Sequence, residues 1–347
     1  MRSWENLRKS EIKNILVIRF WSVAEILSAT PLVRVLRNCF PKAKIDFLLK
    51  EKFSHLLTGC PFVDEIIPCY DADQKRGIKE AFRIYTKIKK YRYDLIVDLQ
   101  GDGQSSFFSF LSRAEFRIGY RLPGWKGKVY TIRVGELPVK RHLVLSYLDL
   151  VKDLFDCGGN PLDLKLFVAK ADDPQQGIHD FGDENKKKLL IHPGVNRLAN
   201  SWPVDKFAKL ADCLVRQYKV EIILAGSDTD SDRQRVGRIN KLINGKGHVF
   251  YHSTLPQLIS LMKNIDVFIG HDNGPMHIAA ALGKHVVGLF GPSDPRVRHP
   301  WGSGHEVLWP KVPCSPCDYR ECPKDKADCM DKIKVSGVLE AVHRFLV

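Results

Sequence analysis

The residues best suited to binding chemistry are Asp272, Asn273, Gly274, Pro275 and Met276, which directly follow an apolar run. Asp and Asn are favoured helix N-cap residues, Gly lets backbone approach a ligand, and Pro fits the first helical turn. The amides of Asn273, Gly274 and Met276, with the helix dipole, would then bind an anion such as a diphosphate. A well-capped structural helix explains the same residues, so the segment alone leaves both interpretations open.

A second loop with binding chemistry spans residues 192–203, HPGVNRLANSWP. It also leaves an apolar run and enters a helical pattern. Gly194 and Val195 would offer backbone amides to a ligand, and Arg197 would offer a cation. The alternative is an ordinary loop between a strand and a helix.

A third loop, residues 225–232, carries Asp228 and Asp230 after another apolar run. A carboxylate in this position suits hydrogen bonds to ribose hydroxyls. The string Asp228-Thr229-Asp230 also matches the aspartate pair with which some enzymes bind a metal. Because Asp is favoured at any helix start, we do not interpret the string as a metal site.

Glu25 is the candidate general base of the first half of the chain. It lies within residues 19–31, RFWSVAEILSATP, which follow the first apolar run. The residue is either a solvated carboxylate at a helix start or a base that faces a ligand cleft. The segment by itself does not separate these two interpretations.

Four of the nine cysteines crowd together in the order C-x2-C-x4-C-x6-C. They are Cys314, Cys317, Cys322 and Cys329. Their spacing fits four thiolates around zinc or an iron–sulfur cluster, although it is not that of a standard zinc ribbon. The alternative is a loop of reduced structural thiols.

The elements that must position these residues are short apolar runs that alternate with helical segments. Such alternation predicts βαβ units and parallel sheets, whose carboxyl edges bind ligands. Strands are predicted at residues 14–20, 44–50, 64–69 and 93–101, and again at 220–227 and 285–291. A strand that runs into a loop is predicted at 188–194 and at 266–274.

The length of 347 residues favours two domains. A polar stretch with proline and glycine, residues 169–188, predicts the boundary between them. We therefore expect an N-terminal domain over residues 1–172 and a C-terminal domain over 185–347. The last helix of the chain is able to pack back on the first domain.

The charge balance favours anionic partners. The chain has 54 Lys and Arg residues against 40 Asp and Glu, a net charge of +14. It lacks an RNA- or DNA-binding motif, so no nucleic-acid partner is predicted. No apolar run reaches the roughly eighteen residues of a membrane helix, and the first run is too short for a signal peptide. We therefore expect a cytoplasmic protein.

Six segments together resemble the ADP-heptose:lipopolysaccharide heptosyltransferases of glycosyltransferase family 9. They occur in the family's order within residues 14–329, and the last is the most specific. The segments are NILVIRFWSVAEILSATPLVRVLR, YDLIVDLQGDGQSS, RIGYR, LLIHPGVNRLANSWP, IILAGSDTD and FIGHDNGPMHIAAALGKHVVGLFGPSDP. A similar group of cysteines occurs in part of this family.

The resemblance implies a GT-B fold, an α/β architecture in which two Rossmann-like domains with parallel sheets face a central cleft. The first domain would bind the acceptor and the second the nucleotide sugar. The reaction would move heptose from an ADP-sugar donor to the anionic inner core of lipopolysaccharide, with inversion and without a catalytic cofactor. Because that acceptor lies in an anionic leaflet, peripheral contact with the cytoplasmic face of the inner membrane is expected.

The resemblance also implies roles for individual residues. Glu25 would deprotonate the acceptor hydroxyl, and the amides near Gly274 would stabilise the departing diphosphate. The residues expected to bind the nucleotide sugar are Gly194, Val195, Arg197, Asn200, Asp228, Asp230, Asp272, Asn273, Gly274, Pro275, Met276 and His277. Those expected to bind the acceptor are Gln100, Gly101, Arg117, Tyr120 and Arg121.

Two departures from the family pattern keep alternatives open. The chain has Ala24-Glu25 where Gly-Asp is usual, and Asn200 where a Lys or Arg often neutralises the diphosphate. They are compatible with a GT-B enzyme that uses another nucleotide sugar or acceptor, and with a homologue that binds ligand but has weakened catalysis. A dinucleotide-dependent oxidoreductase is more distant, since neither half has G-x-G-x-x-G after its first strand.

Overall fold

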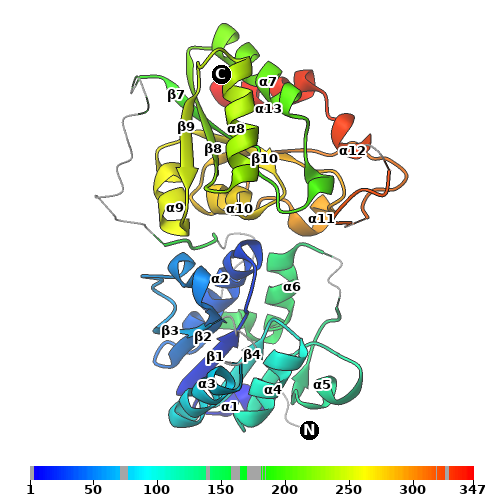
Figure 1. Cartoon of the computed structure of the whole chain (residues 1–347). Coiled ribbons are helices and arrows are strands. Elements are labelled where there is room, and N and C mark those ends of the chain that lie inside the picture. The colour runs from blue at the N-terminus through cyan, green and yellow to red at the C-terminus, as the bar shows by residue number, and fades with distance from the viewer. Residues whose placement is uncertain are drawn as a thin grey trace. The chain divides into compact units, whose positions relative to one another are not determined.

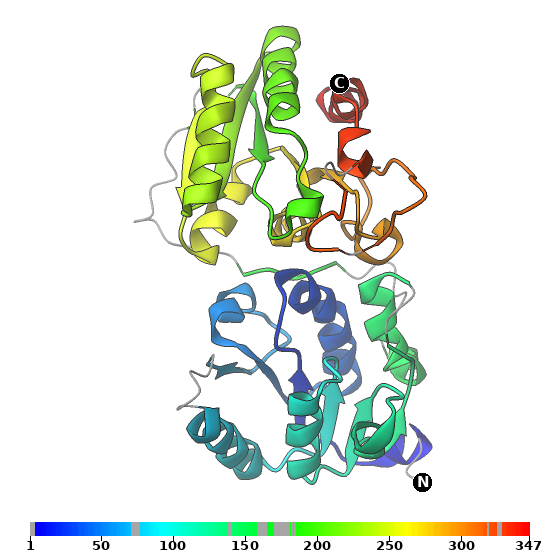
Figure 2. The same cartoon turned by 45° about the vertical axis from the view of Figure 1, so that its right-hand side comes forward.

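The computed structural model describes residues 4–70, 77–137, 141–157, 165–169, 181, 183, 185–317, 319–324 and 328–347. The chain divides into two compact α/β units, Met1–Ala169 and Lys170–Val347, shown in Figures 1 and 2. The segment between the two expected domains, 173–184, lies almost wholly outside the described residues. The domain limits at 172 and 185 therefore stay predictions.

The first unit is built on a six-stranded parallel sheet in the order β3-β2-β1-β4-β5-β6. Its central strands are apolar runs that are buried on both faces, as helices on both sides of a parallel sheet require. The strands are β1 (Asn14–Ile18), β2 (Lys44–Lys50), β3 (Glu65–Cys69), β4 (Leu95–Asp98), β5 (Phe116–Gly119) and β6 (Ile132–Arg133).

Helices of the first unit cover this sheet with apolar faces. Ile84 and Ile88 of α3 and Phe108 of α4 join the core formed with Leu16 and Ile18 of β1. The helices are α1 (Trp4–Lys9), α2 (Val23–Cys39), α3 (Gly77–Tyr91), α4 (Gly103–Leu111), α5 (Gly124–Lys128) and α6 (Leu143–Asp149), with 3-10 turns at Glu51–Leu56 and Lys152–Cys157.

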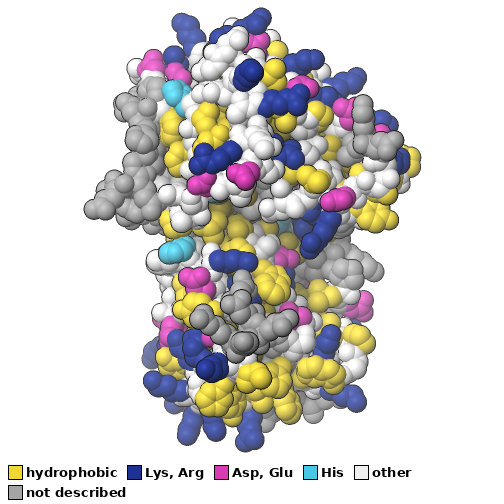
Figure 3. Space-filling model, viewed as in Figure 1, with side chains coloured by type: hydrophobic (Ala, Val, Ile, Leu, Met, Phe, Trp, Pro, Cys, Tyr) yellow, Lys and Arg dark blue, Asp and Glu magenta, His cyan; other side chains and the backbone are white. Residues whose placement is uncertain are grey.

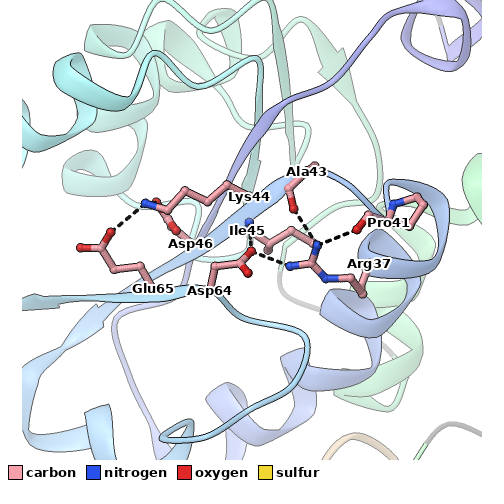
Figure 4. Close-up of polar contacts among 8 residues, drawn as sticks. All are labelled: Arg37, Pro41, Ala43, Lys44, Ile45, Asp46, Asp64 and Glu65. Carbon is pink, nitrogen blue, oxygen red and sulfur yellow. Dashed lines mark hydrogen bonds and ion pairs between the residues drawn. The ribbon is translucent and has the colours of Figure 1, made fainter.

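A polar network fastens the end of α2 to the starts of β2 and β3 (Figure 4). The Arg37 guanidinium donates to the Ala43 carbonyl at 2.6 Å and to the Asp64 carboxylate at 2.5 Å. Lys44 of β2 lies 2.8 Å from Glu65 of β3. Exposed ion pairs contribute little energy each, so these contacts mainly fix where α2 ends and where β2 and β3 begin.

The second unit repeats the architecture, with a parallel sheet in the order β12-β11-β10-β7-β8-β9. Its core includes the fully buried Trp202 and Phe207, whose rings meet edge to face at 4.7 Å. The strands are β7 (Lys187–His192), β8 (Val220–Ser227), β9 (His248–His252), β10 (Val267–His271), β11 (His285–Leu289) and β12 (His305–Leu308).

Helices of the second unit follow the strands as the sequence predicts. The last helix packs against α7, β11 and β12 of its own unit, and its expected return to the first unit stays a prediction. The helices are α7 (Val204–Gln217), α8 (Asp230–Leu242), α9 (Leu255–Lys263), α10 (Gly274–Ala281), α11 (Pro295–Arg298), α12 (Asp328–Asp331) and α13 (Val335–Leu346), with a 3-10 turn, η4, at Leu198–Asn200. Within the described ranges, no helix has both the length and the apolar character to cross a membrane.

Candidate functional site

Glu25 lies in the first turn of α2 and closes its N-terminus. The Ser22 amide donates to Glu25 Oε2 at 2.7 Å, which completes a capping box at the start of the helix. The same oxygen lies 2.6 Å from Nη2 of Arg19, and the Glu25 side chain remains 21% exposed. The carboxylate is therefore held in one position while part of it stays accessible.

Arg19, which directly follows β1, is the buried partner that the sequence did not reveal. Its guanidinium also donates to the carbonyl oxygens of Trp21 at 2.9 Å and Leu99 at 2.7 Å. Burial opposes its charge, but the neighbouring Tyr147 and Glu25 outweigh this effect and raise the pKa of Arg19. Arg19 is thus a fixed cation at the carboxyl edge of the first sheet.

Tyr120, a predicted acceptor residue, follows β5 at this same edge. It is 1% exposed, and among the described residues its hydroxyl has no hydrogen-bond partner. Burial, and then the neighbouring Tyr147, raise its pKa well above the ordinary value, so the hydroxyl stays protonated. It is a buried O–H group at the edge of the sheet where the acceptor is predicted to bind.

Gln100 and Gly101 follow β4, the neighbour of β1, and are held by Asp98. Both of their amides donate to Asp98 Oδ1, at 2.9 and 3.0 Å. The Tyr130 hydroxyl donates to the other oxygen of Asp98 at 2.7 Å. Gly101 has a φ of +69°, which glycine adopts without strain. The tight turn directs Gln100 Oε1 to accept from the Phe20 amide at 3.2 Å.

The two predicted acceptor arginines lie differently. The Arg117 guanidinium donates to the backbone carbonyls of Val129, at 2.7 Å, and Ala114. Arg121 is exposed, and its amide donates to the Gly135 carbonyl at 3.1 Å. The structure therefore groups Gln100 and Tyr120 near Arg19, whereas Arg117 is engaged by backbone.

Asp272 is the centre of the site in the second unit. It follows β10, and its side chain is only 5% exposed. Arg197 Nη2 and His277 Nε2 lie 3.8 and 3.7 Å from its carboxylate. Burial would raise its pKa, but His277, Ser293 and Arg298 outweigh burial and lower the pKa. Asp272 is therefore an anion surrounded by cationic and polar groups.

Loops from neighbouring strands meet at Asp272. Arg197 also donates from Nη2 to Ser293 Oγ at 2.8 Å. Asn200 is buried, and its Nδ2 donates to the Asp272 carbonyl at 3.4 Å. Asn200 occupies the position where family members often carry a Lys or Arg, and here it hydrogen-bonds the backbone of Asp272. The cation near the Asp272 carboxylate is Arg197 instead.

The start of α10 is capped by Asn273. Its Oδ1 accepts a long hydrogen bond of 3.3 Å from the Met276 amide, and its Nδ2 donates to the Gly194 carbonyl at 3.0 Å. Pro275 lies in the first turn of this helix. The capped Met276 amide is therefore less available to a phosphate than that of Gly274, and phosphate binding here stays a prediction.

The predicted ribose carboxylates lie apart from this cluster. Asp228 accepts from Arg233 Nε at 2.6 Å and from Ser253 Oγ at 3.2 Å, and these bonds lower its pKa. Asp230 lies in the first turn of α8, and both carboxylates are exposed. Val195 is half-buried in the loop after β7.

Asp232 is a buried carboxylate near Gly194 that the sequence analysis did not single out. It is buried and accepts from the Ser227 amide at 2.9 Å. A Cβ atom on Gly194 would meet its Oδ2 at 2.6 Å, so only glycine allows this close approach. The sequence does carry a signal for this position. Thr229 is the N-cap of α8, and an acidic residue three positions after an N-cap usually turns its side chain back toward the start of the helix.

Buried histidines lie beneath the loops of the second unit. Burial and the neighbouring His252 lower the pKa of His192 to about 4. Burial lowers the pKa of His271 to about 3, and its Nε2 accepts from the Trp202 amide at 2.9 Å. His271 is therefore neutral, with its proton on the nitrogen that faces the Gly194 carbonyl at 3.4 Å.

The four clustered cysteines line one small cavity of about 20 Å³, together with Ala199, Pro292, Lys324 and Asp328. That volume has room for roughly one water-sized particle. Burial, and then the three neighbouring cysteines, raise the pKa of Cys329. In the part of the chain that the structure describes, no group of three or more His, Cys, Asp or Glu side chains is arranged to hold a metal ion.

The cysteine segment is bonded to both loops that meet at Asp272. The Ala199 amide donates to the Arg320 carbonyl at 3.1 Å, and the Cys317 amide donates to the Pro292 carbonyl at 2.9 Å. Gly291 has no room for a side chain, since a Cβ there would lie 2.9 Å from Cys329 Sγ. The positions of Arg197 and Ser293 thus depend on how this segment packs.

Comparison with solved structures gives the class of protein. A glycosyl transferase family 9 structure from Veillonella parvula matches with a TM-score of 0.81 and 20% identity, covering 97% of this chain and 98% of that one. Escherichia coli ADP-heptose lps heptosyltransferase II matches with a TM-score of 0.74 and 22% identity, covering 96% and 98%. The predicted GT-B fold is confirmed, and the chain has the architecture of a glycosyltransferase.

The family follows from the sequence. The model of glycosyltransferase family 9 (heptosyltransferase) matches residues 81–328, and this chain belongs to that family. Lipopolysaccharide core heptosyltransferase OpsX of Haemophilus influenzae is 22% identical, covering 85% of this chain and 84% of that protein. Lipopolysaccharide heptosyltransferase 3 of Escherichia coli is 26% identical, covering 93% and 96%. The family resemblance predicted from the six segments is confirmed.

A more distant solved structure has a similar fold. The iron-containing dodecameric glycosyltransferase TibC of enterotoxigenic Escherichia coli matches with a TM-score of 0.57 and 13% identity, covering 97% of this chain and 78% of that one. At this identity the likeness concerns the fold alone.

Proposed function

We propose that the chain transfers heptose from ADP-heptose to the inner core of lipopolysaccharide, with inversion at the anomeric carbon. The observation that carries the proposal is the cluster around Asp272, where an acidic side chain, Arg197 and His277 meet at the start of a helix. The relatives named for lipopolysaccharide heptosyl transfer support the choice of sugar and acceptor.

In the second unit, the donor diphosphate lies near Arg197 and the Gly274 amide. The helix dipole and the guanidinium stabilise the negative charge that grows on the β-phosphate as it leaves. Asp272 binds sugar hydroxyls and orients Arg197. Arg197 supplies the charge that family members often place at the position of Asn200.

In the first unit, Glu25 removes the proton from the acceptor hydroxyl. The freed oxygen attacks the anomeric carbon, and the bond from that carbon to the β-phosphate oxygen breaks, with its electron pair leaving on ADP. General-base assistance of this kind contributes about 10²–10⁴ in rate. Arg19 fixes the position of the Glu25 carboxylate, and the Tyr120 hydroxyl and Gln100 bind the acceptor.

The location of the acceptor implies a cytoplasmic enzyme that contacts the inner membrane peripherally. An acceptor in an anionic leaflet suits a chain with a net charge of +14. No cofactor takes part in the transfer step.

The test is ADP release from ADP-heptose in the presence of truncated lipopolysaccharide. Glu25→Gln and Arg197→Ala should each lower the rate by about 10²-fold or more, the first in kcat and the second mainly through donor KM. Glu340→Gln, which changes an exposed carboxylate of the same unit that has no predicted role in binding, is the matched control. A shift in melting temperature with UDP-, GDP- or CMP-sugars but not ADP-sugars would instead support transfer from another nucleotide sugar.

We also propose that Cys314, Cys317, Cys322 and Cys329 bind a structural metal, zinc or an iron–sulfur cluster. The support is the donor set of four thiols that line one cavity; within the described residues these thiols are not arranged to hold a metal, so the sulfurs would have to converge on it. Bound metal would replace the thiol protons and stabilise the loop against Ala199 and Pro292. Elemental analysis of aerobically and anaerobically purified protein decides the matter, and absence of metal from both preparations refutes it.

A further inference from the structure

The outer surface of α3 carries apolar side chains that its own unit does not bury. Ile78 is 85% exposed and Phe82 is 65% exposed, although Ile84 and Ile88 of the same helix are fully buried. Ile78 and Phe82 are four residues apart and therefore lie on one face. The helix has one apolar face for the core and a second apolar strip turned to solvent.

The neighbouring helices continue this exposed apolar strip. Phe107 and Phe110 of α4 are 46% and 61% exposed, while Phe108 between them is buried. Trp125 of α5 is 54% exposed. Because α3 contacts α4 and α4 contacts α5, the three helices stand in a row, as Figures 1 and 2 both show. We call their outer side the α3–α5 face.

The α3–α5 face is strongly basic. Residues 77–92 contain six Lys and Arg residues and one acidic residue. Glu80 pairs with Arg83 at 2.7 Å and Lys87 pairs with Glu65 of β3, so the cations outside these pairs are Lys79, Lys89, Lys90 and Arg92. Residues 103–113 and 121–128 together add four cations and no acid. Figure 3 shows hydrophobic side chains gathered with Lys and Arg side chains over α3 and α4.

A hollow of about 430 Å³ lies between the ends of α3 and α4. It is lined by the cations Lys89, Arg92 and Arg113 and by the aromatic Tyr85, together with Asp94 and Glu115. Asp94 already accepts hydrogen bonds from the Lys13 and Asn14 amides, at 2.8 and 2.9 Å. The hollow precedes β4 and β5, so it lies at the amino edge of the sheet, whereas Glu25 and Gln100 follow carboxyl ends.

We propose that the α3–α5 face docks on an anionic lipid bilayer. Exposed Phe, Trp and Ile side chains enter the boundary between headgroups and acyl chains, and the surrounding cations bind the anionic headgroups. The hollow accommodates a headgroup phosphate beside Lys89, Arg92 and Arg113. The cores of protein–protein interfaces are depleted in Lys, so this mixture of cations and apolar groups fits a membrane better than a second copy of the chain.

The placement puts the outer side of α3, α4 and α5 on the lipid and does not use the residues around Glu25. It gives the proposed membrane contact a defined surface and uses none of the donor-binding residues. Membrane docking is tested with vesicles that contain neither ADP-heptose nor lipopolysaccharide. A failure of vesicle binding can therefore be told apart from a failure of heptose transfer.

The experiment measures co-sedimentation of the full chain with vesicles of phosphatidylcholine alone or of an equimolar mixture with phosphatidylglycerol. The apolar variant is Phe82→Ser, Phe107→Ser and Phe110→Ser, and the cation variant is Lys89→Gln, Lys90→Gln and Arg113→Gln. Each variant has a control that changes three exposed residues of the second unit. The control for the apolar variant is Leu242→Ser, Val249→Ser and Val307→Ser. The control for the cation variant is Lys209→Gln, Lys241→Gln and Lys332→Gln.

We expect binding to the anionic vesicles that weakens with added salt, because screening reduces the attraction. Each cation near the surface contributes about fivefold, so the cation variant should bind about a hundredfold more weakly. The apolar variant should lose binding on a similar scale, and both controls should bind like the unaltered chain. Far-UV circular dichroism checks folding, and Phe110→Ser alone replaces the apolar variant if that variant does not fold.

Three results of the vesicle assay would overturn the proposal. They are no binding to anionic vesicles, equal binding to vesicles of phosphatidylcholine alone, and variants that bind as tightly as their controls. Self-association that the apolar variant abolishes, without vesicle binding, would assign the α3–α5 face to a second copy of the chain and also overturns it.

Discussion

Replacing Arg19 by Met is the most informative perturbation of the first unit. It removes the 2.6 Å contact with Glu25 and leaves the Trp21 and Leu99 carbonyls without their guanidinium donor. Removing one partner of a buried ion pair typically lowers the free energy of unfolding by about 3–5 kcal/mol. Because the Arg19 side chain is 10% exposed and that of Glu25 21%, solvent offsets only part of this loss.

A double-mutant cycle of Arg19→Met and Glu25→Gln measures the interaction energy between these two side chains, apart from their contacts with other residues. If Arg19 and Glu25 interact as described, urea unfolding should give a coupling energy of about 1.5–3 kcal/mol, the range for charged hydrogen bonds. Arg19→Met should lower kcat about 10²-fold, because the Glu25 carboxylate is displaced. The double variant should be no slower than Glu25→Gln alone.

Two results would refute this reasoning. Unfolding free energies that add within about 0.5 kcal/mol would mean that the two side chains do not stabilise each other. A double variant much slower than Glu25→Gln would mean that Arg19 acts on the reaction independently of the carboxylate. The matched control is Arg37→Met, which removes an arginine of the same unit from a more exposed ion pair at the other end of α2.

Three further predictions concern the second unit. Asp272→Asn should raise the donor KM on the order of tenfold or more, since the charge that orients Arg197 is lost; isothermal titration with ADP checks this, and unchanged affinity would contradict it. Gly194→Ala places a Cβ 2.6 Å from Asp232 and should lower the free energy of unfolding by about 1–3 kcal/mol, measured in urea, with Gly237→Ala, which has open space, as control. The lowered pKa values of His192 and His271, about 4 and about 3, mean that the unfolded chain binds more protons below pH 6.5. Stability should therefore fall with acid, by about 2 kcal/mol per histidine between pH 7 and 5, and His271→Asn should flatten that slope.

The fold was predictable where a single stretch of sequence carries the signal. The apolar runs of β1, β2, β4, β7, β8, β10 and β11 are long enough to identify as buried strands. The short strands β5, β6 and β12 and the alternating β9, HVFYH, were not predicted. Their pairing depends on the neighbouring strand more than on their own residues.

The candidate site was predictable in its loops but not in its pairings. Asp272 and Arg197 stand out as polar residues after strands, yet their contact depends on the strand order β10-β7. Arg19 looked like an ordinary residue at the end of a strand, because only the neighbouring β4 supplies its Leu99 partner. The sequence singled out Asp228 and Asp230 for the ribose, which stays a prediction, but it did not single out Asp232, whose contacts with Ser227 and Gly194 depend on how the turn before α8 folds.

The backbone bonds that join the cysteine segment to Ala199 and Pro292 would carry a displacement of that segment to the neighbours of Asp272. Oxidation of Cys329, the buried one of the four, would enlarge or charge an atom in a cavity that holds about one water molecule. The segment must then move, and with it the arginine and serine on either side of Asp272. Affinity for the sugar nucleotide should therefore decline under peroxide and recover when a thiol reductant is restored.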